Sequence, residues 1–208
     1  SLVGSEMCIR DSFRAEAMQS AVPVGVGGMA AVIGLADDDV EAAVAEARET
    51  GRVEAVNFNA PGQVVIAGEK AAVARAIECA KALGCRRAIE LPVSAPFHSS
   101  LMQPAADKLA ARLVETEIQV PAIPVIANID VEVHETPDAI REALARQAAG
   151  AVQWVRTIER MKAAGITDIV ECGPGKVLTG LLRRTAPEIN GHNIFDAASL
   201  AAVLEKLN

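Results

Sequence analysis

Hydrophobic and polar positions along residues 28–93 follow two periods, one typical of strands and one typical of helices. Apolar runs bounded by glycines or turn residues predict strands over 28–35, 52–58, 63–68 and 86–93. Apolar residues three and four positions apart predict two intervening helices, with Val40, Ala43, Val44 and Ala47 on the first and Val73, Ala76, Ile77 and Ala80 on the second. The order strand–helix–strand–strand–helix–strand predicts a ferredoxin-like unit.

Residues 94–208 follow a different pattern, in which helices and strands alternate. Helices are predicted over the segment from Leu101 to Leu113, from Thr136-Pro137-Asp138 onward, and over 154–164, 177–184 and 197–207. Strands are predicted over 123–128, 167–172 and 193–195, and the second of these reads as buried. Such alternation implies an α/β layer whose parallel sheet is covered on both faces.

The same patterns divide the chain into four parts. Residues 1–12 lack a sustained period, so we expect a non-native or disordered leader there. Residues 13–24 are expected to form a helix of a larger subdomain, and residues 25–93 form the ferredoxin-like subdomain. Residues 94–208 would then supply the remainder of the larger α/β subdomain.

Composition narrows the function classes. With 20 Lys and Arg against 27 Asp and Glu, the net charge of −7 argues against a nucleic-acid partner, and 2% aromatic residues offer few platforms for base stacking. No apolar run approaches the roughly 20 residues that cross a membrane, so a soluble chain is expected. Four scattered cysteines without metal-ligand spacing predict no metal site and fit a reducing, cytoplasmic environment.

One histidine lies where catalysis is plausible. His98 follows a strand-like segment and the turn at Ala95-Pro96, just before a helix, which is where open α/β folds place ligand sites. His134 and His192 lie in polar or glycine-flanked surroundings and are expected at the surface. A loop histidine alone is more often structural than catalytic, so a nucleophile is needed to decide the question.

The search for that nucleophile finds none. The 208 residues contain no G-x-S-x-G turn, and Ser94, Ser99 and Ser100 beside His98 are expected to be turn and cap hydroxyls. The cysteines lack a nearby basic partner that would favour a thiolate. The GPGK segment at 173–176 does not complete a P-loop and is interpreted as a tight turn feeding a helix.

Five long segments together resemble a known family. They are FRAEAMQSAVP (13–23), VNFNAPGQVVIAG (56–68), LPVSAPFHSSLMQPAADKL (91–109), LARQ (144–147) and VECGPGKVLTGLL (170–182). Over about residues 13–208 the chain is similar to the malonyl-CoA:acyl carrier protein transacylases, within the acyltransferase family of fatty acid and polyketide synthesis. The resemblance implies an α/β fold: a partial α/β-hydrolase-like acyltransferase subdomain with a ferredoxin-like (β-α-β-β-α-β) insert.

The resemblance also implies roles for four residues of a ping-pong acyl transfer. His98 would be the base that activates a serine, and the main-chain carbonyl of Gln147 would orient its imidazole. Arg14 would pair with the malonyl carboxylate, which distinguishes malonyl from acetyl by a whole charge. Phe97 would leave little room for an α-methyl branch. Each residue also fits a structural role, as a solvated arginine, a packed phenylalanine or a helix-end glutamine.

Further positions would contact the two substrates. Asn57, Asn59 and Gln63 fall where the family meets the coenzyme A or pantetheine arm, although turn-stabilising polar residues are equally expected there. Arg86 and Arg87 match a basic spot facing the acidic carrier protein, or are solvated residues at a strand edge. Malonyl-CoA and the acyl carrier protein are thus the expected partners, and no cofactor is required.

The chain departs from the family pattern in one respect. The family's nucleophile lies in a GHSLGE turn and an oxyanion donor lies in a GQGSQ segment, and both sequences are absent here. We therefore expect the last two-thirds of such an enzyme, inactive alone and with exposed apolar surface. Two alternatives stay open: a polyketide synthase acyltransferase domain, and a non-catalytic ferredoxin-like binding module.

Overall fold

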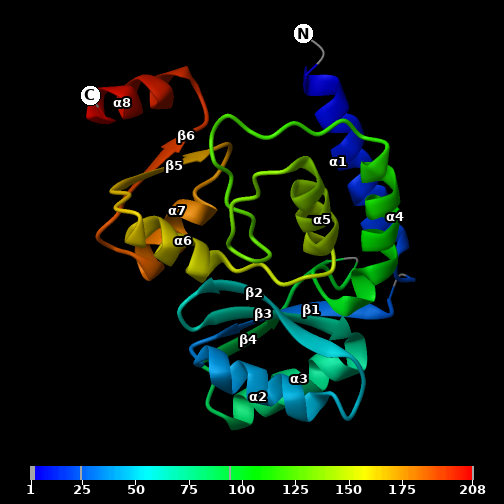
Figure 1. Cartoon of the computed structure of the whole chain (residues 1–208). Helices are drawn as coiled ribbons and strands as arrows, with labels where there is room; N and C mark the ends of the chain where they lie inside the picture. The colour runs from blue at the N-terminus through cyan, green and yellow to red at the C-terminus, as the bar shows by residue number, and fades with distance from the viewer. Residues whose placement is uncertain (1–2, 24, 94, 208) are drawn as a thin grey trace.

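The computed structural model describes residues 3–23, 25–93 and 95–207, and Figure 1 shows their arrangement. A ferredoxin-like unit forms the lower part of the view, and helices with a small parallel sheet lie above it. Helix α1 (Val3–Ser20) precedes the unit in the chain and lies against the later helix α4 (Gln103–Val114). The chain therefore leaves the upper part, builds the lower unit and returns.

The lower unit has the predicted order of elements. They are β1 (Gly27–Ile33), α2 (Asp37–Ala47), β2 (Val53–Ala60), β3 (Gln63–Glu69), α3 (Lys70–Ala82) and β4 (Arg87–Glu90). The four strands form an antiparallel sheet in the order β2-β3-β1-β4, which is the ferredoxin-like order. Both helices cover one face of this sheet, as Figure 1 shows. The predicted ferredoxin-like unit is confirmed.

Burial follows the predicted helix faces. The apolar positions named on α2 and α3 are all buried and pack against one face of the sheet, around Ile66 and Val64. Gly84 has φ +91° directly after α3, a left-handed conformation that favours glycine and ends the helix. The opposite face of the sheet carries a smaller cluster that includes Met29 and Val65, and this face is open to the site described below.

The upper part contains the remaining elements. They are η1 (Ser100–Met102), α4, α5 (Pro137–Gln147), α6 (Trp154–Ala163), β5 (Asp168–Cys172), α7 (Val177–Thr185), β6 (Asn190–Ile194) and α8 (Ala197–Leu207). Thr136 caps α5 as predicted, because its hydroxyl accepts a hydrogen bond from the Ala139 amide. Gly165, with φ +79°, follows α6 and ends it as predicted. Among the described residues, no helix combines the length and apolar character that crossing a bilayer would require.

Two sequence predictions for this part are wrong, and one element begins earlier than expected. The segment 123–128 contributes a single bridge, Ile126 to Val133, because no other described strand pairs with it. Strand β5 pairs in parallel with β6 alone within the described chain, so it is half-buried rather than buried. Helix α1 begins at Val3 and so runs through most of the segment for which a leader was expected.

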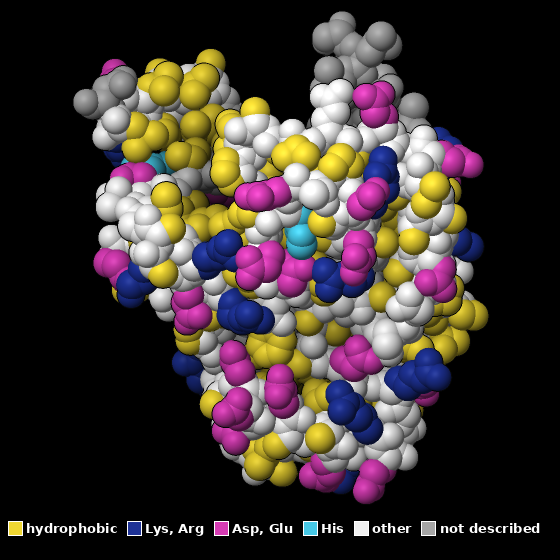
Figure 2. Space-filling view, in the orientation of Figure 1, with side chains coloured by type: hydrophobic (Ala, Val, Ile, Leu, Met, Phe, Trp, Pro, Cys, Tyr) yellow, Lys and Arg dark blue, Asp and Glu magenta, His cyan; other side chains and the backbone are white. Residues whose placement is uncertain are grey.

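An apolar surface accompanies this small sheet. Exposed hydrophobic side chains lie on the segment before α5, on α7, just after β6 and on α8: Val120, Ile123, Val125, Val177, Leu178, Phe195, Leu200, Leu204 and Leu207. Figure 2 shows hydrophobic side chains gathered over the α8 end of the molecule. The described residues of this part therefore carry the exposed apolar surface that the sequence predicts.

The two parts are joined by backbone hydrogen bonds as well as by the chain. Val152, between α5 and α6, donates to the carbonyl of Val56 at 2.8 Å and accepts from the amide of Phe58 at 3.0 Å. This parallel bridge lies beside Asn57 on β2. It fixes the end of α5 against the sheet, and that contact assembles the site.

Candidate active site

A cavity of about 690 Å³ lies between α1 and the face of the sheet that α2 and α3 leave uncovered. Residues of α1, β1–β3 and the segment after β4 line it: Arg14, Ala15, Glu16, Met18, Gln19, Met29, Asn57, Asn59, Val65, Leu91, Val93, Phe97 and His98. Five residues predicted from the sequence meet here, although they are spread over 85 positions from Arg14 to His98. The fold therefore brings together Arg14, Asn57, Asn59, Phe97 and His98.

His98 is held by backbone from a distant part of the chain. Its Nδ1 lies 3.1 Å from the carbonyl oxygen of Gln147, at the end of α5, which is the predicted contact. A carbonyl only accepts hydrogen bonds, so Nδ1 carries the hydrogen and Nε2 of a neutral ring is free to accept a proton. His98 also has φ +64°, a conformation rare for residues with a side chain and typical of functional positions.

The surroundings of the imidazole keep it neutral. Burial lowers the pKa of His98, and hydrogen bonds to the backbone of Gln147 and Gly150 oppose this effect. The positive charge of Arg14, which lines the same cavity, lowers the pKa of His98 further. A neutral imidazole with a free Nε2 is the form that can act as a general base.

The serines beside His98 are engaged elsewhere. The hydroxyl of buried Ser99 donates to the carbonyl of Pro96 at 2.6 Å. The amide of Ser100 donates to Glu54 at 3.0 Å, and its hydroxyl donates to the same carboxylate. The Ser99 bond fits the predicted turn role, whereas neither hydroxyl caps the following helix, and Ser94 lies outside the described residues. Neither described serine is placed to act as the nucleophile for His98.

The Phe97 side chain packs against two hydrophobic clusters. Its ring packs against the cluster that contains Ala17 and Met18 of α1, and also against the cluster of Met29 and Val65 on the sheet. It therefore joins helix to sheet while forming part of the cavity wall. Both interpretations drawn from the sequence, a packing role and a role in limiting cavity space, are compatible with this position.

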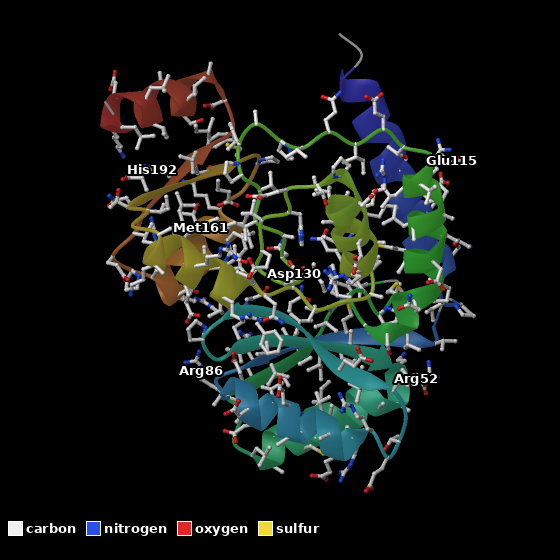
Figure 3. The ribbon with its side chains drawn as sticks, viewed as in Figure 1. Arg52, Arg86, Glu115, Asp130, Met161 and His192 are labelled. Carbon is white, nitrogen blue, oxygen red and sulfur yellow. The ribbon has the colours of Figure 1, made fainter. Side chains whose placement is uncertain are left out.

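Three predicted contact residues lie outside the cavity. Gln63 begins β3, and its side-chain oxygen accepts a hydrogen bond from Arg184 of α7 rather than facing the cavity. Arg86 and Arg87 are exposed, and Arg87 pairs with Ile33 at the end of β1 far from Met29. Figure 3 shows Arg86 at the edge of the ferredoxin-like unit. The assignment of Gln63 to the substrate arm has no support in this geometry, and the carrier-protein role of the two arginines stays a prediction.

Sequence reasoning missed polar groups that also face the cavity. Glu16 and Gln19 line the cavity from α1. The sequence pattern of this helix is irregular, so it did not predict which of its polar residues face the cavity. The backbone of Gly150, which faces the imidazole, is likewise invisible in a residue pattern. No cluster of three or more His, Cys, Asp or Glu suited to a metal ion occurs in the part of the chain that the structure describes.

Comparison with known proteins decides the family. A family model described as "Acyl transferase domain" matches residues 7–205 of the chain. The chain belongs to the acyl transferase family. The match begins within the segment for which an unrelated leader was expected, and it extends the family relationship several residues ahead of Phe13.

Curated relatives of this acyl transferase carry one name. The chain is 49% identical over 192 residues to the malonyl CoA-acyl carrier protein transacylase of Escherichia coli (strain K12), and the match covers 92% of this chain and 62% of the relative. It is 37% identical over 195 residues to the protein of the same name from Bacillus subtilis (strain 168), covering 93% and 62%. The chain thus spans about 62% of the length of the curated relatives it matches.

Solved structures support the α/β acyltransferase fold. The acyl-carrier-protein S-malonyltransferase of Burkholderia pseudomallei 1710b superposes with a TM-score of 0.91 at 57% identity, covering 93% of this chain and 63% of that one. A type II PKS acyl-carrier protein in complex with its malonyl-transacylase gives a TM-score of 0.91 at 46% identity, covering 93% and 62%. The predicted fold class is confirmed.

Proposed function

We propose that these 208 residues form the histidine-bearing part of a malonyltransferase that moves malonyl from coenzyme A to the thiol of an acyl carrier protein. One observation carries the proposal: His98, held through Nδ1 by the Gln147 carbonyl, faces the same cavity as Arg14. Transfer of an acyl group that carries a carboxylate needs a base and a cation in one cavity, and His98 and Arg14 would supply them. The names of the relatives support the same activity.

The transfer would proceed in two half-reactions with a serine from outside these 208 residues. In the first, Nε2 of His98 takes the serine proton while the serine oxygen bonds to the malonyl thioester carbon, and the C–S bond breaks. The imidazolium returns the proton to the departing coenzyme A thiolate. In the second half-reaction, His98 takes the proton of the carrier thiol, whose sulfur bonds to the acyl carbon and forms the new thioester. The C–O bond to the serine breaks, and the imidazolium returns the proton to the serine oxygen.

Arg14 would select the acyl group. Its guanidinium presents two donors that match a carboxylate, and an acetyl group has no charge to pair with it. Asn57 and Asn59, which line the cavity from the sheet, would hydrogen-bond the amide-containing pantetheine arm. Arg86 and Arg87 would lie outside the cavity as a basic patch for an acidic carrier protein, on a chain whose net charge is −7.

The test measures malonyl transfer from coenzyme A to purified carrier protein, using the chain preceded by its native upstream sequence and, separately, the 208 residues alone. We expect transfer only from the longer protein. His98→Ala should lower its rate at least about 100-fold, whereas His192→Gln, which removes a histidine outside the cavity, should not. Retained transfer in His98→Ala would refute the role of His98 as the base. A longer protein without any serine nucleophile would favour the non-catalytic binding module.

A second arm tests selectivity. A charge-assisted contact contributes about 1.5–3 kcal/mol, so Arg14→Ala should lower the preference for malonyl over acetyl by about 10- to 150-fold. Arg112→Gln is the matched control, because Arg112 is half-exposed on α4 and pairs with Glu115 outside the cavity. An unchanged preference in Arg14→Ala would remove its assigned role. Fatty acid and polyketide carrier proteins tested side by side distinguish the two pathways.

A further inference from the structure

A tight loop of residues 127–132 lies beside α5, and its backbone is strained. The amide of Ala127 donates to the Glu132 carbonyl, and the amide of Val131 donates to the Ala127 carbonyl, both at 2.9 Å. Val131, a β-branched residue, is buried with φ +64°. A β-branched residue in this region is an outlier that persists only where its surroundings hold it.

Helix α6 holds this loop from one side. Arg160 of α6 donates to the carbonyl of Val131 and pairs with the carboxylate of Glu132 at 2.7 Å. The carbonyl of Asn128 accepts from the amide of Gln153 at 2.9 Å, just before the same helix. The 127–132 loop is therefore fixed in its strained conformation by α6.

On its other side, the 127–132 loop contacts both ends of the turn that follows α5. The carboxylate of Asp130 accepts from Arg146 at 2.7 Å. Ile129 packs directly on Gly150, where an added Cβ would lie 2.0 Å from the Ile129 Cδ1 atom. Figure 3 shows Asp130 in the centre of the molecule, below α5. Between these two contacts lie residues 147–150, whose backbone holds the imidazole of His98.

We infer that the 127–132 loop is a positioning element for His98, acting through Asp130 on Arg146 and through Ile129 on Gly150. Neither Asp130 nor Ile129 lines the cavity, so both are positioning residues rather than catalytic ones. The inference deepens the proposed function, because an acyl-transfer base must present Nε2 in a fixed direction. Its geometric basis, however, is independent of any transfer.

Removing the Asp130 charge has a defined consequence for the imidazole. Among the described residues, Arg146 would keep only its ion pair with Glu142, at 3.5 Å on the same helix, and would no longer tie the end of α5 to the loop. The hydrogen bond from Nδ1 to the Gln147 carbonyl would weaken while burial and the charge of Arg14 remain. We therefore expect a larger share of the Nε2–H tautomer and a pKa of His98 that is lower still.

The experiment follows the imidazole nitrogens by ¹⁵N NMR during a pH titration of the 208-residue chain. The chain has three histidines, and the signals that disappear in His98→Gln are those of His98. His134 is left in place because its Nε2 lies 3.3 Å from the Asp130 carboxylate. Asp130→Asn and Ile129→Ala should both shift the tautomer balance and the pKa of His98. Asp138→Asn is the matched control, because Asp138 pairs with Arg141 on the same helix at 2.8 Å and lies far from the turn in sequence.

Each outcome decides the inference. Wild-type His98 signals in both Asp130→Asn and Ile129→Ala, with the fold intact by circular dichroism, would overturn it. An equal shift in Asp138→Asn would also overturn it, since any acidic residue on α5 would then suffice. If Asp130→Asn does not fold, Arg146→Gln replaces it, because Arg146 is half-exposed. A longer protein that transfers no malonyl would refute the proposed function and leave the NMR result standing.

Discussion

Gly68 is a position where one methyl group should be enough to disturb the sheet. It lies on β3, where it pairs with Gly28 of β1 and with Val53 of β2. A Cβ atom at Gly68 would lie 2.1 Å from the carbonyl oxygen of Arg52 and 2.6 Å from the Cα atom of Val53. Both are backbone atoms that cannot rotate away, so Gly68→Ala must push β2 from β3.

Two contributions determine how far Gly68→Ala lowers the free energy of unfolding. The adjacent hydrogen bond from the Glu69 amide to the Arg52 carbonyl, at 2.7 Å, would be lost. Losing that bond costs about 1 kcal/mol and overpacking costs about 1–3 kcal/mol, so Gly68→Ala should lower the free energy of unfolding by about 2–4 kcal/mol. Because β3 is central, the displacement also reaches β1.

Urea unfolding of the 208-residue chain measures this effect, with Gly180→Ala as the control. Gly180 lies within α7, and no heavy atom lies within 4 Å of an added Cβ there. Alanine in a helix interior is favoured over glycine by about 0.5–1 kcal/mol, so this variant should be stabilised. Relative to wild type, the urea midpoint should fall in Gly68→Ala and rise in Gly180→Ala. A Gly68→Ala protein within about 0.5 kcal/mol of wild type would refute the steric reasoning.

Two further predictions concern pH and capping. Burial lowers the pKa of folded His98 below the ordinary value of 6.5, so the unfolded chain binds this proton more readily and stability falls as the pH drops through 6.5. The melting temperature of His98→Gln should therefore fall less than that of the wild type between about pH 7.5 and pH 5. Parallel plots of melting temperature against pH would contradict this. Glu171 accepts from the amides of Leu178 and Thr179 at the start of α7, at 3.1 and 2.8 Å. Glu171→Ala should cost about 0.5–2 kcal/mol in urea unfolding, and Glu171→Gln less; equal losses would exclude capping.

The ferredoxin-like unit could be predicted because the residues that bury its helices lie within its own sequence. The apolar faces of α2 and α3 pack on β1–β3, all between residues 27 and 82, so local periodicity and tertiary burial agree. The segment 123–128 has an equally apolar pattern. Periodicity alone could not show that Ile123 is 77% exposed, because strand pairing depends on a neighbour.

The candidate site depends on contacts between distant positions. His98 and Gln147 are separated by 49 positions, and only the family resemblance predicted that they meet. The same kind of inference placed Gln63 at the substrate arm, but its amide instead contacts Arg184, 121 positions away. Asp130 and Ile129 act on His98 through backbone, and backbone contacts leave no residue-type signal in a single sequence.

The cavity wall contributed by the sheet has a consequence for how this chain can diversify. Along β1 and β3, Met29 and Val65 line the cavity, whereas their immediate neighbours Ala30, Val64 and Ile66 point into the helix-covered core. Neighbouring residues on these strands therefore have separate roles, because one shapes the cavity and the next packs in the core. A substitution at Met29 or Val65 therefore changes the cavity wall while leaving the side chains of the helix-covered core in place.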